Sequence, residues 1–524
     1  MAWQKLLALG KTVEVNVILF FSFKRFTGQT CICHTACMLT SRPYAFVARP
    51  WELNKVESID VSDAMGANIR IDARGNQVLR VLPRLNEDIN EEWISDKARY
   101  AIDGLRRQRL DKPYLRGEDG RLHPVSWDDA FAAIAGRMKK TKADKMAAIA
   151  GDQIDAEAMF ALKSLFEKVG SPHIDCRQDG AKLTAKNRSS YIFNTTIAGI
   201  DEADAIVIIG SNPRIEAPVM NARIRRRYLN AQIPIAHIGP ELDLTYPVGN
   251  LGDDMAVLEA LASGKHPFAK QLKKAKKPMV IVGMGALRRA DGSAVMALCH
   301  QLAEGVGMVT ADWNGFNVLH HAAARVAGLD LGFVPGKGGK DVQGILSAAT
   351  KGEMDFVWLL GADELDTDML AKPFVVYQGH HGDKGAQCAD VVLPGAAWAE
   401  KDGLYVNFEG RVQMARRAAF PPGDAREDWA ILRAFSETIN KTLSFDSLNE
   451  LRKQMVAEVP VFAKLDEIQP AKWAKFGRTA KVKSEPVEAG LDEFYMTSAI
   501  SRASETMAGC YQANQAGKSA IAAE

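Results

Sequence analysis

The carboxylates of residues 390–413 are the groups in this chain whose type and spacing come closest to acid–base chemistry. Glu400, Asp402 and Glu409 follow a β-branched run and a Pro-Gly turn. A pair of carboxylates can act as general acid and general base. No nucleophile and no histidine stands beside them, so we assign them no catalytic role. The segment instead has the form of a strand that reaches the lip of a sheet, where α/β proteins hold ligands.

A second set of polar residues, His380, His381, Asp383 and Cys388, resembles a group of metal ligands. Side chains of adjacent residues at a strand end point in opposite directions, so the two histidines are poorly placed to hold one ion together. We therefore predict a glycine-rich loop whose polar side chains line a cleft.

The densest cluster of soft ligands is formed by Cys31, Cys33 and Cys37 with His34. Its C-x-C-x3-C spacing departs from the C-x2-C-x2-C spacing typical of iron–sulfur sites, and no fourth cysteine lies near. The remaining four cysteines are isolated, which argues against a disulfide framework and favours a reducing compartment. We predict that the cluster holds no metal, and we assign no catalytic, cofactor-binding or metal-ligating residue in the chain.

Two glycine-containing turns could meet a nucleotide. In residues 208–226 a strand leads through Gly-Ser-Asn-Pro into a helix, whose free N–H groups could bind a phosphate. The alternative is a tight connection in which Asn212 caps the helix, with Pro213 in the first turn in either case. In the second turn Arg288 follows Gly283-x-Gly285 where a dinucleotide fingerprint has its third glycine, which favours a plain turn.

The composition indicates a soluble or peripherally attached globular protein of two to four domains. The chain has 524 residues, of which 47% are hydrophobic and 25% charged. A net charge of +2 gives no reason to expect nucleic acid as the main partner. The apolar run 13–23 is about half the length needed to span a bilayer.

Apolar runs that end in glycine recur through the centre of the chain, and each is followed by residues predicted to form a helix. They are residues 146–151, 205–210, 235–239, 279–283, 356–361 and 374–379. Continuous apolar strands that alternate with helices predict parallel sheets covered on both faces. The insertions between these units favour two α/β lobes.

A small β-rich domain is expected before these lobes. Residues 58–61, 68–73 and 77–83 alternate apolar and polar side chains, with a hairpin turn signal at Gly75. A helix should then follow over residues 90–110, with Asn90 as its N-cap.

The next helix should start at Ser126, which is followed by two acidic residues. Four segments are predicted along the chain. Residues 1–40 have no assigned fold, residues 41–116 form a β-rich domain, residues 117–440 form an α/β domain, and residues 441–524 form an extended tail.

Long passages resemble one family. They are residues 41–116, DCRQDGAKL (175–183), SSYIFNTTIAGIDEADAIVIIGSNPRIEAPVMNARIRRR (189–227), LDLTY (242–246), VYQGHHGDKGAQCADVVLPGAAWAEKDGLYVNFEGRVQ (376–413) and FYMTSAISRASETMAGC (494–510). Together they resemble the G subunit of the proton-pumping NADH-quinone oxidoreductase, the large peripheral-arm iron–sulfur subunit of respiratory complex I in its alphaproteobacterial and mitochondrial form. The resemblance covers roughly residues 39–512 and places the chain in the molybdopterin oxidoreductase superfamily.

The resemblance implies an order of domains of which this chain keeps only the later ones. In the family a 2Fe-2S domain and two 4Fe-4S clusters come first, followed by a small β-rich domain and a large α/β domain. Here His34 stands where the last cluster cysteine would fall, and we carry over no cluster ligand. We expect residues 1–38 to reflect a shifted reading frame or a wrongly assigned start.

A second departure from the wider superfamily concerns molybdenum. Residues 41–175 contain no cysteine for an iron–sulfur cluster. Ala181 stands roughly where active molybdopterin enzymes place a metal ligand, and Cys176 comes too early. We therefore expect no molybdenum, and no cofactor held by this chain.

The expected function is a scaffold role in the electron-input arm of complex I, whose intact subunit passes electrons from NADH and flavin toward quinone. Two alternatives stay open: an active molybdopterin oxidoreductase of the formate dehydrogenase type, or a protein that keeps a nucleotide or pterin remnant at 210–214 and 395–411. The implied partners are the flavin- and NADH-binding subunit and the connecting-arm subunits. The implied place is the cytoplasmic face of the bacterial inner membrane, or the matrix side in mitochondria.

Overall fold

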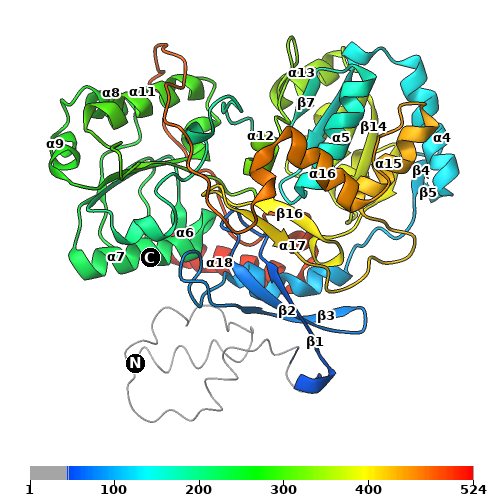
Figure 1. Cartoon of the computed structure of the whole chain (residues 1–524), viewed down its shortest axis with the longest axis horizontal. Helices are drawn as coiled ribbons and strands as arrows, with labels where there is room; N and C mark the ends of the chain where they lie inside the picture. The colour runs from blue at the N-terminus through cyan, green and yellow to red at the C-terminus, as the bar shows by residue number, and fades with distance from the viewer. Residues whose placement is uncertain (1–43, 45–46, 523–524) are drawn as a thin grey trace.

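Two α/β lobes lie side by side in the computed structural model, which describes residue 44 and residues 47–522 (Figure 1). One lobe contains a seven-stranded sheet in the order β5-β4-β15-β14-β13-β6-β7. The other contains a five-stranded sheet in the order β10-β9-β8-β11-β12. A three-stranded sheet, β1-β2-β3, lies beneath both in this view. The predicted α/β class with parallel sheets and a small β-rich part is confirmed.

The seven-stranded sheet is parallel from β15 to β7, and an antiparallel pair extends it at one edge. Its strands are β4 (Tyr114–Arg116), β5 (Leu122–Pro124), β6 (Met146–Ala150), β7 (His173–Asp175), β13 (Phe356–Leu360), β14 (Phe374–Gly379) and β15 (Val391–Pro394). Apolar side chains of one face pack with α4 (Trp127–Lys140), α5 (Ala156–Val169) and α15 (Asp428–Thr438). Those of the other face pack with α13 (Val342–Lys351). The Ser126 hydroxyl caps α4, as predicted, by accepting the N–H of Asp129.

The five-stranded sheet is parallel throughout. Its strands are β8 (Ala205–Ile209), β9 (Ile235–Ile238), β10 (Gly249–Asn250), β11 (Pro278–Gly283) and β12 (Phe316–Leu319). Helix α7 (Pro218–Ala231) covers one face, and α8 (Met255–Ala262), α9 (Pro267–Lys274) and α11 (Gly292–Gly305) cover the other (Figure 1). Two short helices, α6 (Pro213–Glu216) and α10 (Met284–Leu287), follow β8 and β11 directly. All six apolar runs of the sequence are therefore strands of parallel sheets.

The small sheet consists of β1 (Asn54–Ile59), β2 (Asn68–Arg74) and β3 (Gln77–Pro83), all antiparallel. Gly75 has a φ of +58° in the turn between β2 and β3, as the hairpin prediction requires.

The helix predicted over residues 90–110 is shorter than expected. Helix α3 covers only Asp96–Tyr100 and continues as the 3-10 turn η4 (Ala101–Arg106). Asn90 is not its N-cap, because the Asn90 side chain accepts the N–H of Asn68 and donates to backbone carbonyls around it. The cap is Ser95, whose side chain accepts the N–H of Ala98.

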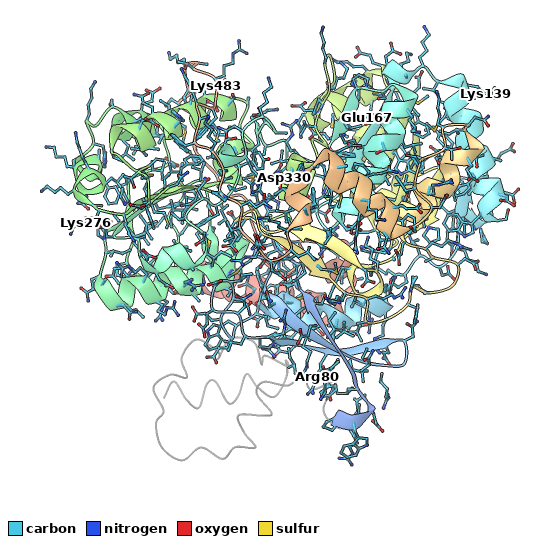
Figure 2. The ribbon with its side chains drawn as sticks, in the orientation of Figure 1. Arg80, Lys139, Glu167, Lys276, Asp330 and Lys483 are labelled. Carbon is cyan, nitrogen blue, oxygen red and sulfur yellow. The ribbon has the colours of Figure 1, made fainter. Side chains whose placement is uncertain are left out.

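The C-terminal region is partly helical rather than extended throughout. Helix α16 (Leu448–Glu458) packs on α5, and the chain ends in α17 (Ala499–Ala503) and α18 (Glu505–Ala522). Residues 464–498 between them contain no helix or strand and cross the five-stranded lobe before descending between the lobes (Figure 1). Lys483 marks where this segment passes the edge of that lobe (Figure 2). The polar composition of this region led to the prediction of an extended tail, because helices that depend on packing against other elements leave little signal in the local sequence.

The remaining elements are short. They are η3 (Pro50–Glu52), η5 (Ala143–Lys145), η6 (Arg188–Ser190), η7 (Ala198–Asp201), α12 (Arg325–Asp330), η8 (Thr367–Leu370), α14 (Lys384–Cys388), η9 (Trp398–Glu400), β16 (Gly403–Val406), β17 (Val412–Ala415) and η10 (Pro460–Ala463). The domain limits stay a prediction, although β4 pairs with β15 across the limit placed at residue 116. Within the described residues, no helix combines the length and the apolar character needed to cross a membrane.

Candidate functional site

The segment 390–413 begins with β15 and reaches the carboxyl edge of the seven-stranded sheet, as predicted. Beyond this edge Glu400 forms a two-point ion pair with Arg109, with N–O distances of 2.5 and 2.6 Å. Both side chains are less than a tenth exposed, at 7% and 9%. Glu400 also accepts the backbone N–H of Ala397. The carboxylate therefore holds the chain after β15 against the segment before β4.

The corner between β16 and β17 is a closed hydrogen-bond network. Glu409 accepts the N–H of Ile197 and the Nε of Arg411, each at 2.8 Å. Asn407 accepts the N–H of Arg411 at 2.9 Å and donates to the carbonyl of Met65. These side chains are turned toward neighbouring backbone and away from solvent. The corner joins the hairpin to both the small sheet and the five-stranded lobe.

Lys401 is the buried charge of this segment that sequence reasoning missed. Its Nζ lies 2.5 Å from an oxygen of Asp155 and 2.6 Å from an oxygen of Asp428. Asp155 is the N-cap of α5 and Asp428 is the first residue of α15. Lys401 stands between Glu400 and Asp402 in the sequence, and nothing in that spacing distinguishes it. Asp402 accepts the N–H of Arg417 in a neighbouring turn.

The histidine pair does not form a metal site with its neighbours. The prediction that the two side chains point in opposite directions is wrong, because the Nδ1 atoms of His380 and His381 lie 2.5 Å apart. His381 Nε2 lies 2.8 Å from a backbone carbonyl, so Nε2 carries the proton and Nδ1 accepts from His380. Asp383 instead pairs with Arg502, and the Cys388 thiol donates to a backbone carbonyl. Across the described residues, no three His, Cys, Asp or Glu side chains are grouped to hold a metal ion.

The turn after β8 is a tight connection, but Asn212 does not cap it as that interpretation supposed. Its side chain makes no cap hydrogen bond, whereas its N–H donates to Glu216 at 2.7 Å. The Ser211 hydroxyl donates to the other oxygen of Glu216 at 2.9 Å. Burial raises the pKa of Glu216. A carboxyl group already occupies the donors that a phosphate would need.

The turn after β11 is also closed. Gly285 lies so near the carbonyl of Glu488 that an added Cβ would come within 1.9 Å of its oxygen. Arg288, at the place of a third glycine, forms an ion pair with Glu488 at 2.6 Å. The glycines here permit contact between two parts of the same chain.

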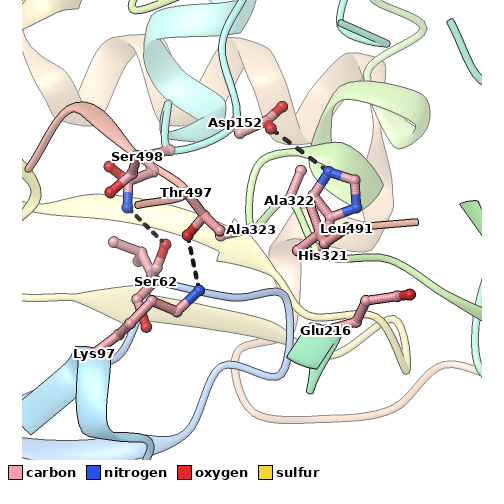
Figure 3. A pocket seen from close by; sticks show the side chains of 12 residues that line it. Ser62, Lys97, Asp152, Glu216, His321, Ala322, Ala323, Leu491, Thr497 and Ser498 are labelled. Atoms are coloured by element: carbon pink, nitrogen blue, oxygen red, sulfur yellow. Dashed lines mark hydrogen bonds and ion pairs between the residues drawn. The ribbon is translucent and has the colours of Figure 1, made fainter. Parts of the chain in front are cut away.

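The space between the lobes is a small polar cavity of about 20 Å³ (Figure 3). Its lining includes Lys97, Asp152, Glu216, His321 and Thr497. A volume of this size holds about one water molecule, whereas sites for organic cofactors usually measure roughly 300–1,000 Å³. In this conformation the residues present do not fit a pterin or a nucleotide.

Lys97 is the cation that closes the lower side of this cavity (Figure 3). Its Nζ donates to Thr497 at 2.9 Å, and its field lowers the pKa of the nearby carboxyls of Asp60 and Asp63. Burial nonetheless dominates and raises both, that of Asp60 to about 7. Burial also lowers the pKa of Lys97. These charges join the small sheet to the C-terminal segment.

The side chains after β7 that could act as metal ligands are buried or already paired. Ala181 presents a methyl group, and its N–H donates to Asp179. Asp179 pairs at 3.0 Å with Arg325, whose guanidinium is 1% exposed. Burial raises the pKa of the Cys176 thiol to about 12, so the thiolate form that metals bind is disfavoured. The residues at this place do not fit a metal–pterin group.

The cysteine cluster at residues 31–37 lies outside the described residues. His34 and the whole of residues 1–38, for which we expect a shifted reading frame or a wrongly assigned start, also lie outside them.

Three family models match the chain. The model described as "Molybdopterin oxidoreductase" matches residues 109–438, more than half of the chain. "NADH-ubiquinone oxidoreductase NDSU1/NuoG-like, 4Fe-4S domain" matches residues 53–103, and the model for the C-terminal part of the G subunit of NADH-ubiquinone oxidoreductase matches residues 467–510. The segment 53–103 contains no cysteine, so its residues do not fit a 4Fe-4S cluster.

Known proteins give a consistent picture. The chain is 45% identical over 477 residues to the G subunit of the NADH-quinone oxidoreductase of Rickettsia bellii, covering 91% of this chain and 68% of that protein. It is 47% identical over 476 residues to the mitochondrial "NADH dehydrogenase [ubiquinone] iron-sulfur protein 1" of Solanum tuberosum, covering 90% and 63%.

Among solved structures, acetylene hydratase from Pelobacter acetylenicus has the same fold. The TM-score is 0.57 at 13% identity, with 79% of this chain and 72% of that chain covered. Fold, motifs and relatives agree: the chain belongs to the family of G subunits of NADH-quinone oxidoreductases and carries its molybdopterin oxidoreductase-type core.

Proposed function

We propose that this chain is a scaffold subunit in the electron-input arm of a proton-pumping NADH-quinone oxidoreductase and performs no cofactor chemistry with its described residues. The observation that carries the proposal is that side chains and backbone of the chain itself already fill the turns after β8 and β11, where a ligand would bind. The Glu216 carboxyl group takes the backbone donor of Asn212, and Gly285 is covered by the C-terminal segment. A phosphate or a pterin would have to displace both.

The arrangement of buried charges fits a structural role. Ion pairs such as Arg109–Glu400 and Asp155–Lys401–Asp428 connect segments that are distant in sequence, and their side chains are almost fully buried. Removal of one partner from such a buried pair is strongly destabilising, because it leaves an uncompensated buried charge. A rigid platform is what neighbouring subunits need for docking.

The clusters of the assembled enzyme are, in this proposal, held by sequence outside the described residues or by other chains. The matched 4Fe-4S segment 53–103 offers no thiolate. Electron transfer from NADH and flavin toward quinone would then pass beside this scaffold. The partners are the flavin- and NADH-binding subunit and the connecting-arm subunits, at the cytoplasmic or matrix face of the inner membrane. The names of the relatives support membership in the enzyme complex.

Purification of the tagged chain from detergent-solubilised membranes of its source cells tests the proposal. We expect stoichiometric recovery of other NADH-quinone oxidoreductase subunits by mass spectrometry, and no stoichiometric molybdenum or tungsten by elemental analysis. For comparison, the tagged Lys401→Met variant should be less stable and recover fewer subunits.

Two results would overturn the scaffold role. Stoichiometric molybdenum or tungsten would support an active oxidoreductase of the formate dehydrogenase type. A folded chain recovered alone from cells that contain the assembled enzyme would exclude membership in the complex. Denaturation followed by chromatography would reveal any retained pterin or nucleotide.

A further inference from the structure

Residues 483–490 lie along the carboxyl edge of the five-stranded sheet as a bound peptide lies in a crevice. We propose that the edge formed by the ends of β8 and β11 is a peptide-binding site whose ligand is this segment of the same chain, called here the internal ligand. The proposal goes beyond the scaffold function and does not depend on assembly with other subunits. It rests on contacts at each end of the internal ligand and along its length.

Arg289 is the main clamp on the backbone of the internal ligand. Its guanidinium donates to the carbonyls of Lys483, Glu485 and Pro486 at 2.9, 2.7 and 3.1 Å. Asp291 fixes the guanidinium through two bonds of 2.8 and 3.0 Å and accepts the N–H of Lys483 at 2.7 Å. A side chain that donates to three backbone carbonyls of one segment recognises its main chain rather than its side chains.

The opposite side of the internal ligand pairs with the loop before α8. The N–H of Val487 donates to the carbonyl of Asp253 at 2.8 Å. The hydroxyl of Ser484 donates to Asp254 at 2.7 Å, and Asp254 forms an isolated bridge with Pro486. The internal ligand is therefore held by main-chain and side-chain hydrogen bonds to a loop, and it adds no strand to the sheet.

The floor of the crevice is made of glycines. An added Cβ on Gly210 would lie 2.9 Å from Val487, and one on Gly285 would lie 1.9 Å from the carbonyl oxygen of Glu488. Val487 is 2% exposed. In nucleotide-binding folds glycines at this edge let a phosphate approach the backbone. Here the same freedom of approach is used by peptide.

The far end of the internal ligand is fixed by charge. The N–H of Gly490 donates to Glu216 at 3.1 Å, and the side chain of Glu488 pairs with Arg288 at 2.6 Å. Glu216 thus bonds both to the turn after β8 and to the internal ligand. Because the Glu216 carboxyl group accepts hydrogen bonds at this position, the site favours a ligand with a backbone N–H and disfavours an anionic ligand such as a phosphate.

Emptying the crevice while keeping the chain connected provides the direct test. In the emptied variant, residues 483–490 are replaced by a Gly-Ser linker of about twice the length, whose flexibility and lack of the Val487 and Glu488 side chains disfavour its binding in the crevice. A fluorescently labelled peptide with the sequence KSEPVEAG should bind the emptied variant, as measured by anisotropy. A tethered segment has an effective concentration of about 1 mM, so a peptide with a Kd of about 10 µM should bind the unaltered chain about 100-fold more weakly.

Two controls identify the site. The peptide carrying Val487→Asp should not bind the emptied variant, and Arg289→Ala in that variant should abolish binding of the original peptide. The proposal would be refuted if the folded emptied variant did not bind the peptide, or bound it no more tightly than the unaltered chain does. Preference of the emptied variant for GDP over the peptide would show instead that the crevice remains a nucleotide site.

If the emptied variant does not fold, hydrogen exchange of the full chain decides the matter. Arg289→Ala should accelerate exchange of the amides in 483–490 by at least about tenfold, because three carbonyl contacts are lost. Arg478→Ala, an exposed arginine in the same C-terminal region, serves as the matched control and should change nothing. Unaltered exchange in Arg289→Ala would refute the proposal.

Discussion

Replacement of Lys401 by methionine would leave two buried carboxylates facing each other without a cation. The side chains of Lys401, Asp155 and Asp428 are 5%, 4% and 3% exposed, so water cannot take over the role of the ammonium group. Methionine keeps much of the aliphatic volume and removes the charge. Loss of one partner from a buried pair costs about 3–5 kcal/mol. We expect the upper part of this range, because two carboxylates lose the same partner.

Native-state hydrogen exchange of α5 and α15 is the appropriate assay. The chain has several lobes, and a single free energy of unfolding is not well defined for such a protein. Exchange of amides in α5 and α15 measures the free energy of local opening where the two aspartates lie. At neutral pH, Lys401→Met should speed this exchange by about 10³- to 10⁴-fold, the equivalent of about 4–5 kcal/mol.

The pH dependence gives a second readout of the same variant. Burial raises the pKa of Asp428, and Lys401 is the main cation that opposes this rise. Without Lys401 the folded chain should take up a proton on mild acidification, so the loss of stability should shrink as the pH falls. Adding Asp428→Asn to the variant should restore part of the stability at neutral pH.

The matched control is Lys145→Met. Lys145 pairs with Asp355 on the surface, where the two side chains are 41% and 37% exposed. Its replacement should cost less than about 1 kcal/mol. A Lys401→Met variant that loses no more stability than Lys145→Met, or whose loss does not change with pH, would refute the reasoning.

Burial raises the pKa of the Cys176 thiol to about 12. Iodoacetamide at about pH 8 should therefore leave Cys176 unmodified in the folded chain and modify it after denaturation, and mass spectrometry of the peptides would reveal early modification if this were wrong. Burial, followed by the charge of Asp63, raises the pKa of Asp60 from 3.8 to about 7. Stability from this group should be fully present below the unfolded value and lost as the pH rises through about 7. Asp60→Asn should flatten that pH dependence in native-state hydrogen exchange of β1 and β2, and an unchanged slope would contradict it. Ser126→Ala should lower the opening free energy of the first turn of α4 by about 1 kcal/mol, and exchange equal to that of the unaltered chain would disprove the cap.

The central strands of both parallel sheets could be predicted because burial on two faces makes their sequences continuously apolar. All side chains of β6, β8 and β13 are buried. Strand β12 escaped prediction because it contains Asn317, whose side chain accepts the N–H and the hydroxyl of Thr195. A polar residue satisfied by a distant partner interrupts the apolar pattern without weakening the strand.

The chemistry of the candidate residues could be read from the sequence, but their partners could not. Glu400 and Arg109 are 291 positions apart, and Glu216 and Gly490 are 274 positions apart. Local spacing carries no information about such pairs. The helices of the C-terminal region were missed for the same reason, since most helical stability in proteins comes from packing against other elements rather than from intrinsic propensity.

The order of strands has a consequence for synthesis of the chain. The five-stranded sheet, from β8 (Ala205–Ile209) to β12 (Phe316–Leu319), is inserted between β7 and β13 of the other sheet. Strand β6 leaves the ribosome long before β13, its hydrogen-bonded neighbour, exists. The inserted lobe can therefore fold first, as domains do during translation. Until β13 is synthesised, the edge of β6 that will pair with it stays without a hydrogen-bonded neighbour. Interruption of translation after β12 should release a folded lobe joined to a half-built, association-prone sheet.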